Sequence, residues 1–296
     1  MGIKRQVLFA GYHLAKKTGY IQKKNESLKC ANILYFHRIN DYDSDPLTTS
    51  PKIFDDLMKI VSRDYNPISL QELIKGIREK KPFEPNTVVV TFDDGYRDNF
   101  LYAAPILKKY NIPATFFITS GFINTERIFP WDEEAGVKHL LMTWDEVREL
   151  TRMGFEIGAH TISHVDLGTA PIDVATKEIF GCKEKIESEL GQEISTFAFP
   201  FGRRDCIRDE TLEIVRKAGF DCCCSGYGGK VSMNSDLFNL KRVSMYPSVT
   251  EMLMEVDNFM TFYDGKMSIN LFTSRAVVPR LVAGWGCVES FTNWLL

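Results

Sequence analysis

The sequence predicts an α/β fold in which parallel strands alternate with helices. Short apolar runs rich in β-branched residues, such as the VVVTF of residues 88–92, alternate along the chain with amphipathic segments of helical length. Such uninterrupted runs are typical of strands whose sheet is covered on both faces. The chain has 296 residues, 44% hydrophobic and 25% charged, so it can build one large domain around such a sheet.

The expected elements begin with a strand at 32–36 and two amphipathic helices at 54–63 and 70–79, the second capped by Ser69. From there, strands and helices alternate. The further expected strands are 88–92, 114–119, 156–159, 196–199 and 220–225. The further expected helices are 103–110, 144–153, 174–190 and 210–218.

Residues 1–28 are expected to be a basic N-terminal arm. Residues 1–25 hold six lysines and arginines and no acidic residue, and Val7, Ala10 and Leu14 recur at helical spacing. The arm is expected either to be a surface helix on the domain or to lie on an anionic membrane face. No stretch approaches the roughly 18 uncharged apolar residues that a membrane span needs, and no convincing signal-cleavage site follows the arm's weak apolar stretch.

The remainder is expected to be one catalytic domain, residues 29–262, followed by a C-terminal tail, residues 263–296, to which the sequence assigns no role. A net charge of −3 excludes strong, chain-wide attraction to nucleic acid. Seven cysteines, three of them consecutive at 222–224, do not suit a disulfide framework. We therefore expect reduced thiols and a cytoplasmic setting.

Two pairs of polar residues follow predicted strands. Asp93 and Asp94 directly follow the strand at 88–92, and Gly95 then lets the backbone turn. His160 and His164 follow the strand at 156–159. The carboxyl ends of parallel strands meet on one face of a β/α barrel, where active sites are built. Two imidazoles and one carboxylate are a usual ligand set for catalytic zinc, whereas an acidic turn or helix cap is the alternative reading of the aspartate pair.

Three motifs in this order resemble those of a known family. VTFDDGY at 90–96, HTISH at 160–164 and FPFG at 199–202 are similar to the first three motifs of the polysaccharide deacetylases, also called the NodB-homology fold or carbohydrate esterase family 4. Three supporting segments also match: YFHRI at 35–39, PATFFIT at 113–119 and KAGFD at 217–221. The resemblance covers residues 30–245 and implies a distorted (β/α) barrel of about seven parallel strands.

The resemblance also implies an activity and roles for five residues. The protein would be a metal-dependent hydrolase that removes N-acetyl groups from amino sugars. Asp94, His160 and His164 would hold a divalent metal, with zinc as the expected ion. Asp93 would be the general base that takes a proton from water. The backbone N–H of Phe201 would stabilise the oxyanion.

Two departures from the family pattern need replacements. The family often has an arginine two residues before the proline of FPFG to orient the base, but here that residue is Ala198. Arg203, Arg204 or Arg242 could take its place, and the sequence does not choose among them. The family's late histidine, which protonates the leaving amine, is also absent, because no histidine follows His164.

His37, at the end of the first strand, is the expected proton donor. YFHRI resembles the start of the biofilm-polysaccharide deacetylase subgroup, in which an early histidine takes this role, and the alternative is a structural histidine. His139 is expected to be structural. Substrate contacts are expected among residues 96–99, Trp131 and Trp144, although buried tryptophans more often pack in a core.

The expected substrate is an N-acetylated glycan, either a bacterial polysaccharide or its lipid-linked precursor. One alternative is another C–N hydrolase of this fold that opens cyclic imides or ureides, for which a small closed pocket is expected. The other is a glycan-binding protein that has lost catalysis. The basic arm and the reduced cysteines together suggest the cytoplasmic side of an anionic membrane. The sequence assigns no oligomeric state.

Overall fold

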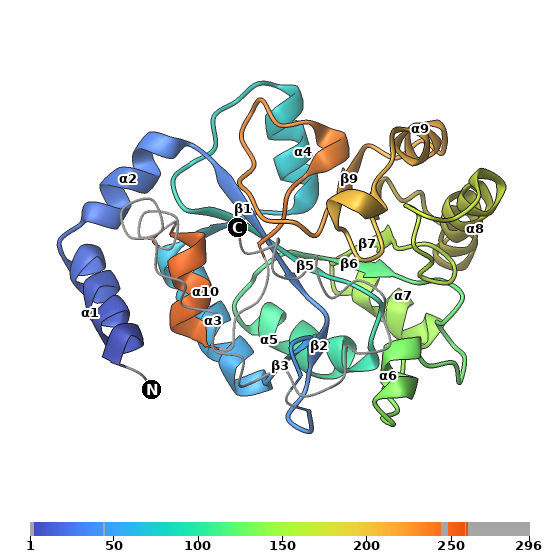
Figure 1. Cartoon of the computed structure of the whole chain (residues 1–296), viewed down its shortest axis with the longest axis horizontal. Helices are drawn as coiled ribbons and strands as arrows, with labels where there is room; N and C mark the ends of the chain where they lie inside the picture. Colours follow the sequence, from blue (N-terminus) through green and yellow to red (C-terminus); the bar gives the residue numbers. More distant parts are fainter. Residues whose placement is uncertain (1–2, 44, 244–247, 258, 260–296) are drawn as a thin grey trace.

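The computed structural model describes residues 3–43, 45–243, 248–257 and 259 (Figure 1). Its centre is a seven-stranded sheet in the order β1-β5-β6-β7-β8-β9, with β4 beside β5, and every pairing in it is parallel. This confirms the predicted α/β class and the number of strands. The strands are β1 (Ala31–Phe36), β4 (Asn66–Pro67), β5 (Thr87–Phe92), β6 (Ala114–Ile118), β7 (Glu156–Ala159), β8 (Thr196–Ala198) and β9 (Cys222–Cys224).

Helices surround the curled sheet (Figure 1). Those that the sequence predicts are α3 (Pro51–Asp64), α4 (Leu70–Arg78), α5 (Ala104–Lys109), α7 (Trp144–Arg152), α8 (Ile172–Leu190) and α9 (Asp209–Lys217). Local signals explain where several begin. Ser69 and Thr143 form capping boxes with the glutamate three residues later, and Ser50 caps α3, which starts with proline. A π-helical turn, Asn99–Ala103, precedes α5, so the helical segment begins four residues before the expected start at residue 103.

A short segment closes the curled sheet between its two ends. β9 bridges to Leu240, and β1 bridges to Val243. The N–H of Ser225 donates to the Leu240 carbonyl at 2.9 Å, and the N–H of Val243 donates to the Ile33 carbonyl at 2.7 Å. Arg242 lies between these two bridges with only 1% of its surface exposed. The closure therefore brings a guanidinium group into the interior of the barrel.

Aromatic side chains fill the core between β1, β5, β6 and the outer helices. Phe92 stacks on Phe116 with ring centroids 4.7 Å apart, and the ring of Phe54, from α3, meets Phe36 edge-on at 5.1 Å. Phe116 and Phe117 are both buried. This packing holds the strand ends in fixed positions relative to one another.

The N-terminal arm forms two helices, α1 (Ile3–Lys17) and α2 (Tyr20–Leu28), which lie beside α10 (Val249–Val256) at one edge of the molecule (Figure 1). Leu8, Tyr12 and Ile21 are buried in the hydrophobic core cluster. Tyr12 donates a hydrogen bond to the buried Asp257 at 2.7 Å. Among the described residues, no helix has the length and apolarity to cross a bilayer.

The six cysteines that the structure describes are all free thiols. Residues 263–296, the predicted tail, lie outside the described part of the chain. The sequence predicted neither β4 nor α10. It also did not predict the remaining short elements, which are β2 (Arg38–Ile39), β3 (Thr48–Thr49), α6 (Pro130–Glu134) and two 3-10 helices at Arg204–Cys206 and Leu237–Asn239.

Candidate metal centre and active site

The carboxyl ends of β1, β5, β7 and β8 meet around a cavity of about 360 Å³. His37 follows β1, Asp93 and Asp94 follow β5, His160 and His164 follow β7, and Phe201 follows β8. All six site residues expected from the sequence line this cavity. The other lining residues are Tyr35, Leu47, Trp131, Phe199, Arg203, Gly226 and Arg242.

Asp94, His160 and His164 form a cluster that fits a metal ion. One ligand atom from each lies within 4.8 Å of the others. Asp94 Oδ1 is 3.5 Å from His160 Nε2 and 3.3 Å from His164 Nε2. Ligands bonded at roughly 2.1 Å in a tetrahedron would lie about 3.4 Å apart. The two distances from the carboxylate to the imidazoles therefore match the spacing of ligands around a tetrahedral metal ion.

Hydrogen bonding in this cluster argues for a cation between the side chains. His160 Nδ1 lies 2.8 Å from the Ala198 carbonyl, which can only accept, so Nδ1 carries the proton and Nε2 presents a lone pair to Asp94. Asp94 Oδ1 and His164 Nδ1 are buried and have no hydrogen-bond partner in the described part of the chain. The lone pair of His160 Nε2 therefore faces Asp94 Oδ1, and both atoms are hydrogen-bond acceptors. Two acceptors that face each other in a buried site are unfavourable unless a cation lies between them.

The protonation states favour the same conclusion. Burial lowers the pKa of His160, and burial together with the His160 charge lowers that of His164 well below its ordinary value. Both rings are therefore neutral, the form that binds metals. Burial, with the Asp93 charge, raises the pKa of Asp94 well above its usual range. A bound cation would relieve this penalty.

Unlike Asp94, Asp93 has a positively charged partner, because Arg242 donates two hydrogen bonds to its carboxylate. Arg242 Nη1 and Nη2 lie 2.7 Å from the two carboxylate oxygens of Asp93, and Arg242 Nε donates to the Ser225 carbonyl at 2.8 Å. Burial alone would raise the pKa of Asp93, but the Arg242 charge and hydrogen bonds, with His160, lower it to about 2. Of the three arginines that could replace the missing one, Arg242 is therefore the one that binds Asp93. Arg203 lies at the exposed rim and pairs with Asp166 and Asp205.

His37 lies beside the charged pair at the cavity wall. Burial lowers its pKa to about 4, against the opposing charge of Asp93. Its ring meets Tyr35 edge-on at 5.5 Å, and its backbone carbonyl accepts a hydrogen bond from Asn99 at 2.7 Å. The imidazole is therefore neutral near pH 7 before substrate binds.

Several site residues have the backbone in the left-handed region, where non-glycine residues are uncommon. The φ angles are 77° at Asp94, 64° at Thr161, 57° at His164 and 60° at Phe201. Such strain often accompanies positions where the fold orients functional groups. At Phe201, the backbone N–H donates to no group within the described part of the chain. This N–H is therefore available to an oxyanion.

The predicted substrate contacts are only partly correct. Trp131 lines the cavity, its ring 4.9 Å from that of His164, and its Nε1–H donates to Tyr96 Oη at 2.9 Å. Tyr96 is instead fully buried and donates to Asp132 at 3.0 Å. Asp98 and Asn99 are buried too, and Arg97 pairs with Glu146 outside the cavity.

Trp144 also lies outside the cavity, in the core. Of the two readings the sequence left open for Trp144, substrate contact or core packing, the structure shows packing: Trp144 opens α7 and is buried in the core cluster. His139, predicted to be structural, is buried with its Nε2 3.1 Å from Asp43. The sequence did not indicate Tyr35, Leu47 or Gly226 as lining residues.

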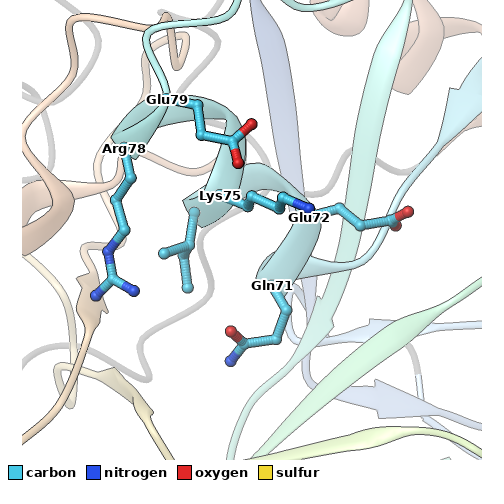
Figure 2. Close-up of a pocket in the computed structure, with 6 residues that line it drawn as sticks. Gln71, Glu72, Lys75, Arg78 and Glu79 are labelled. Atoms are coloured by element: carbon cyan, nitrogen blue, oxygen red, sulfur yellow. The ribbon is translucent and has the colours of Figure 1, made fainter.

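A second cavity, of about 460 Å³, lies on α4 (Figure 2), and its lining contains no candidate metal-binding cluster. Its lining side chains, Gln71, Glu72, Ile74, Lys75, Arg78 and Glu79, all come from this helix and the residue that follows it. None of them is a site residue expected from the sequence. The larger cavity is therefore not the candidate active site.

Comparisons with known proteins agree with the motifs. Residues 80–223 match the family model described as polysaccharide deacetylase. The Bacillus subtilis protein YxkH, whose name assigns it to the polysaccharide deacetylases, is 28% identical over 246 residues, which cover 79% of this chain and 81% of YxkH. The poly-β-1,6-N-acetyl-D-glucosamine N-deacetylase of Staphylococcus aureus is 23% identical over 257 residues, covering 84% of this chain and 81% of the enzyme.

Solved structures show the same fold. The Streptococcus pyogenes deacetylase PplD, solved with acetate, has a TM-score of 0.65 and 26% identity, covering 77% of this chain and 98% of PplD. IcaB from Ammonifex degensii has a TM-score of 0.66 at 21% identity, covering 77% of this chain and 97% of IcaB, and this likeness concerns the fold. Together, these matches confirm the resemblance drawn from the sequence motifs.

Proposed function

We propose that this chain, which carries a polysaccharide deacetylase domain, hydrolyses the acetamide of an N-acetylated amino sugar with a zinc ion held by Asp94, His160 and His164. One observation carries the proposal. Two adjacent aspartates have opposite environments: Asp94 faces two neutral imidazoles, and Asp93 is held ionised by Arg242. This divides metal binding and proton transfer between neighbouring residues.

A divalent metal bound to the three ligands would act as a Lewis acid, lowering the pKa of a water molecule toward 7 and polarising the acetamide carbonyl. Asp93 would accept the proton of the attacking water, while Arg242 keeps its carboxylate oriented. The Phe201 N–H would donate to the oxygen of the tetrahedral intermediate. Ala198 contributes only its carbonyl, which sets the tautomer of His160.

His37 is the proposed donor of a proton to the leaving amine. It lines the cavity and is neutral at pH 7 in the free protein. The ring must therefore gain a proton during turnover, and Asp93, which would have just taken one from water, is the charged group that acts most strongly on its pKa. His37 would thus take the role of the late histidine that this chain lacks.

The proposed substrate is a polymer or lipid-linked chain of N-acetylated amino sugars, such as the poly-β-1,6-N-acetyl-D-glucosamine named for the Staphylococcus aureus relative. The cavity of about 360 Å³ is near the small end of ligand pockets, so we expect it to admit one sugar unit with its acetamide. Phe201, one of the lining residues, is 37% exposed, so the cavity reaches the molecular surface there. An open rim suits a long glycan better than a small cyclic imide.

Comparing Asp93→Asn with Asp94→Asn tests this division of roles. Asp93→Asn should keep stoichiometric zinc and lose about 10²- to 10⁴-fold in the rate of acetate release. Asp94→Asn should bind zinc at least tenfold more weakly, because it removes a direct ligand. Metal content by elemental analysis and acetate release are measured on the same samples. Loss of zinc from Asp93→Asn, or full zinc binding by Asp94→Asn, would contradict the assignment.

A further inference from the structure

Helix α1 has two apolar faces, and only one of them is covered by the rest of the protein. Leu8 and Tyr12 point into the core and are 5% and 1% exposed. Val7 and Leu14, one heptad apart on the outward side, are 58% and 63% exposed, with Ala10 and Gly11 between them also exposed. The spacing 7, 10, 11, 14 places these residues on one stripe of the helix.

The stripe cannot turn inward, because α1 is held in place by one buried and one partly buried polar contact. Tyr12 Oη donates to Asp257 at 2.7 Å, and Arg5 forms an ion pair with Glu251 of α10 at 2.7 Å. Rotating the helix to bury Leu14 would break both contacts and expose Tyr12. The outward apolar stripe is therefore a fixed feature of the surface.

Helix α2 also carries exposed apolar side chains. Tyr20 is 46% exposed and Leu28 is 40% exposed. Ten large hydrophobic side chains are exposed in the described part of the chain, and four of them, Val7, Leu14, Tyr20 and Leu28, fall within these two helices. We call these four residues the arm patch. Such a concentration marks a contact surface rather than scattered exposure.

The charges around the arm patch are basic. Lys17, Lys23 and Lys29 are exposed, and none forms an ion pair with the described residues. Residues 1–29 contain seven lysines and arginines and one acidic residue, Glu26, so they carry +6 while the rest of the chain carries −9, which together give the net charge of −3. Lys17 follows Leu14 by three residues and therefore flanks the stripe.

The basic charge around the arm patch indicates which partner could cover it. Residues 260–296 contain three basic and two acidic residues, a net charge of +1, and do not complement a basic surface. A second copy that docked the same face symmetrically would bring lysine against lysine. A bilayer with anionic headgroups complements both properties, because apolar side chains enter the boundary of the acyl chains while lysines meet the phosphates.

We propose that the arm patch of α1 and α2 docks the protein on an anionic lipid surface. Binding is peripheral, since the helices lie on the domain and contribute only their outward side chains. The proposal stands apart from the hydrolytic site, because none of its residues lines the catalytic cavity.

Co-sedimentation of the full chain with vesicles tests this. The protein should bind equimolar phosphatidylglycerol–phosphatidylcholine vesicles, bind phosphatidylcholine vesicles at least tenfold more weakly, and be released by high salt. Leu14→Ser should weaken binding about tenfold, and Lys17→Glu together with Lys23→Glu by a similar factor. Leu101→Ser, at an exposed leucine outside the arm, is the matched control and should bind as the unaltered protein does.

Equal binding to neutral and anionic vesicles, or binding unaffected by Leu14→Ser, would overturn the proposal. So would a change in the sedimentation coefficient of the free protein on Leu14→Ser, which would assign the patch to a second copy. The thermal midpoint of each variant checks folding, and the high exposure of the substituted side chains predicts little change in it.

Discussion

Asp93 and Asp94 are adjacent in the chain, yet their side chains have opposite partners. Asp94 faces imidazole nitrogens, and Asp93 is bound through both oxygens by a fully buried arginine. A charge pair buried in this way depends strongly on its geometry, because a guanidinium matches a carboxylate with two parallel hydrogen bonds and an ammonium does not. The orientation of the proposed base therefore depends on Arg242.

Arg242→Lys should lower kcat for acetate release by about 10- to 100-fold, because a lysine keeps the charge but cannot hold both oxygens of Asp93. Zinc content should be unchanged, since Arg242 does not contact the three ligands. Arg203→Lys at the exposed rim is the matched control and should change kcat less than about threefold. Equal losses in the two variants would show that Arg242 does not position the base.

His37 should make the folded protein sensitive to acid. Its folded pKa of about 4 lies below the ordinary 6.5, so the unfolded chain binds a proton first as the pH falls. The resulting loss of stability begins near pH 6.5 and is complete below about pH 4, reaching on the order of 2 kcal/mol at pH 5.

His37→Gln should therefore lose less stability than the unaltered protein between pH 7 and pH 5. Urea unfolding of both proteins in the presence of a chelator measures the difference without a contribution from metal binding. Parallel stability profiles for the two proteins would contradict the lowered pKa.

The loops that follow the strands determine where the site residues lie, and the turn after β5 is an example. Gly95, directly after Asp94, has φ of 89°, and a Cβ there would lie 2.9 Å from Ile123 Cδ1 and 3.2 Å from Ile118 Cγ2. Both the backbone conformation and the space favour glycine at this position. The turn that follows β5 therefore depends on a residue without a side chain.

Gly95→Ala should destabilise the fold by about 2–4 kcal/mol and weaken zinc binding by displacing Asp94. Gly154→Ala separates the two causes, because Gly154 has φ of 88° but nothing within 4 Å of an added Cβ. This control should cost only about 1 kcal/mol and leave zinc binding intact. Equal unfolding free energies for the two variants would show that crowding at Gly95 has no effect.

Long periodic elements were predictable from the sequence, and short ones were not. The VVVTF run and the cap at Ser69 indicated β5 and α4 correctly, because local sequence decides such features. β2, β3 and α6 are too short to show a period. The role of Trp144 was left open for a related reason, since composition does not tell which way a helix turns its indole.

The arrangement of the whole molecule depends on contacts between distant segments. The motifs indicated which residues would gather at the strand ends, but Arg242 contacts Asp93 across 149 residues. Only the closure of the sheet through residues 240–243 brings it there. Choosing it over Arg203 and Arg204 required the three-dimensional structure.

The two ends of the described chain are joined at Asp257. This carboxylate is 2% exposed and accepts hydrogen bonds from Tyr12 at 2.7 Å and Tyr65 at 2.8 Å, while Lys16 lies 3.5 Å away. The cluster connects α1, α3 and the end of α10. The N-terminal helices should therefore unfold together with the domain.

Tyr12→Phe should lower the free energy of unfolding by about 1.5–3 kcal/mol, because it removes a hydrogen bond to a buried charged group. Tyr102→Phe, at a tyrosine that is 42% exposed, is the control and should change it by less than about 0.5 kcal/mol. Urea unfolding followed by circular dichroism measures both. A separate early transition for Tyr12→Phe alone would show that the helices unfold independently of the domain.

Acetate release from oligomers of β-1,6-linked N-acetylglucosamine tests the central claim most directly. The purified protein is assayed as isolated, after chelation and after zinc is added back, with Asp93→Asn in parallel. We expect release to stop on chelation, to return with zinc, and to be absent from Asp93→Asn at every step. Release that survives chelation, or that Asp93→Asn retains, would contradict the account of a metal-dependent deacetylase with Asp93 as its base.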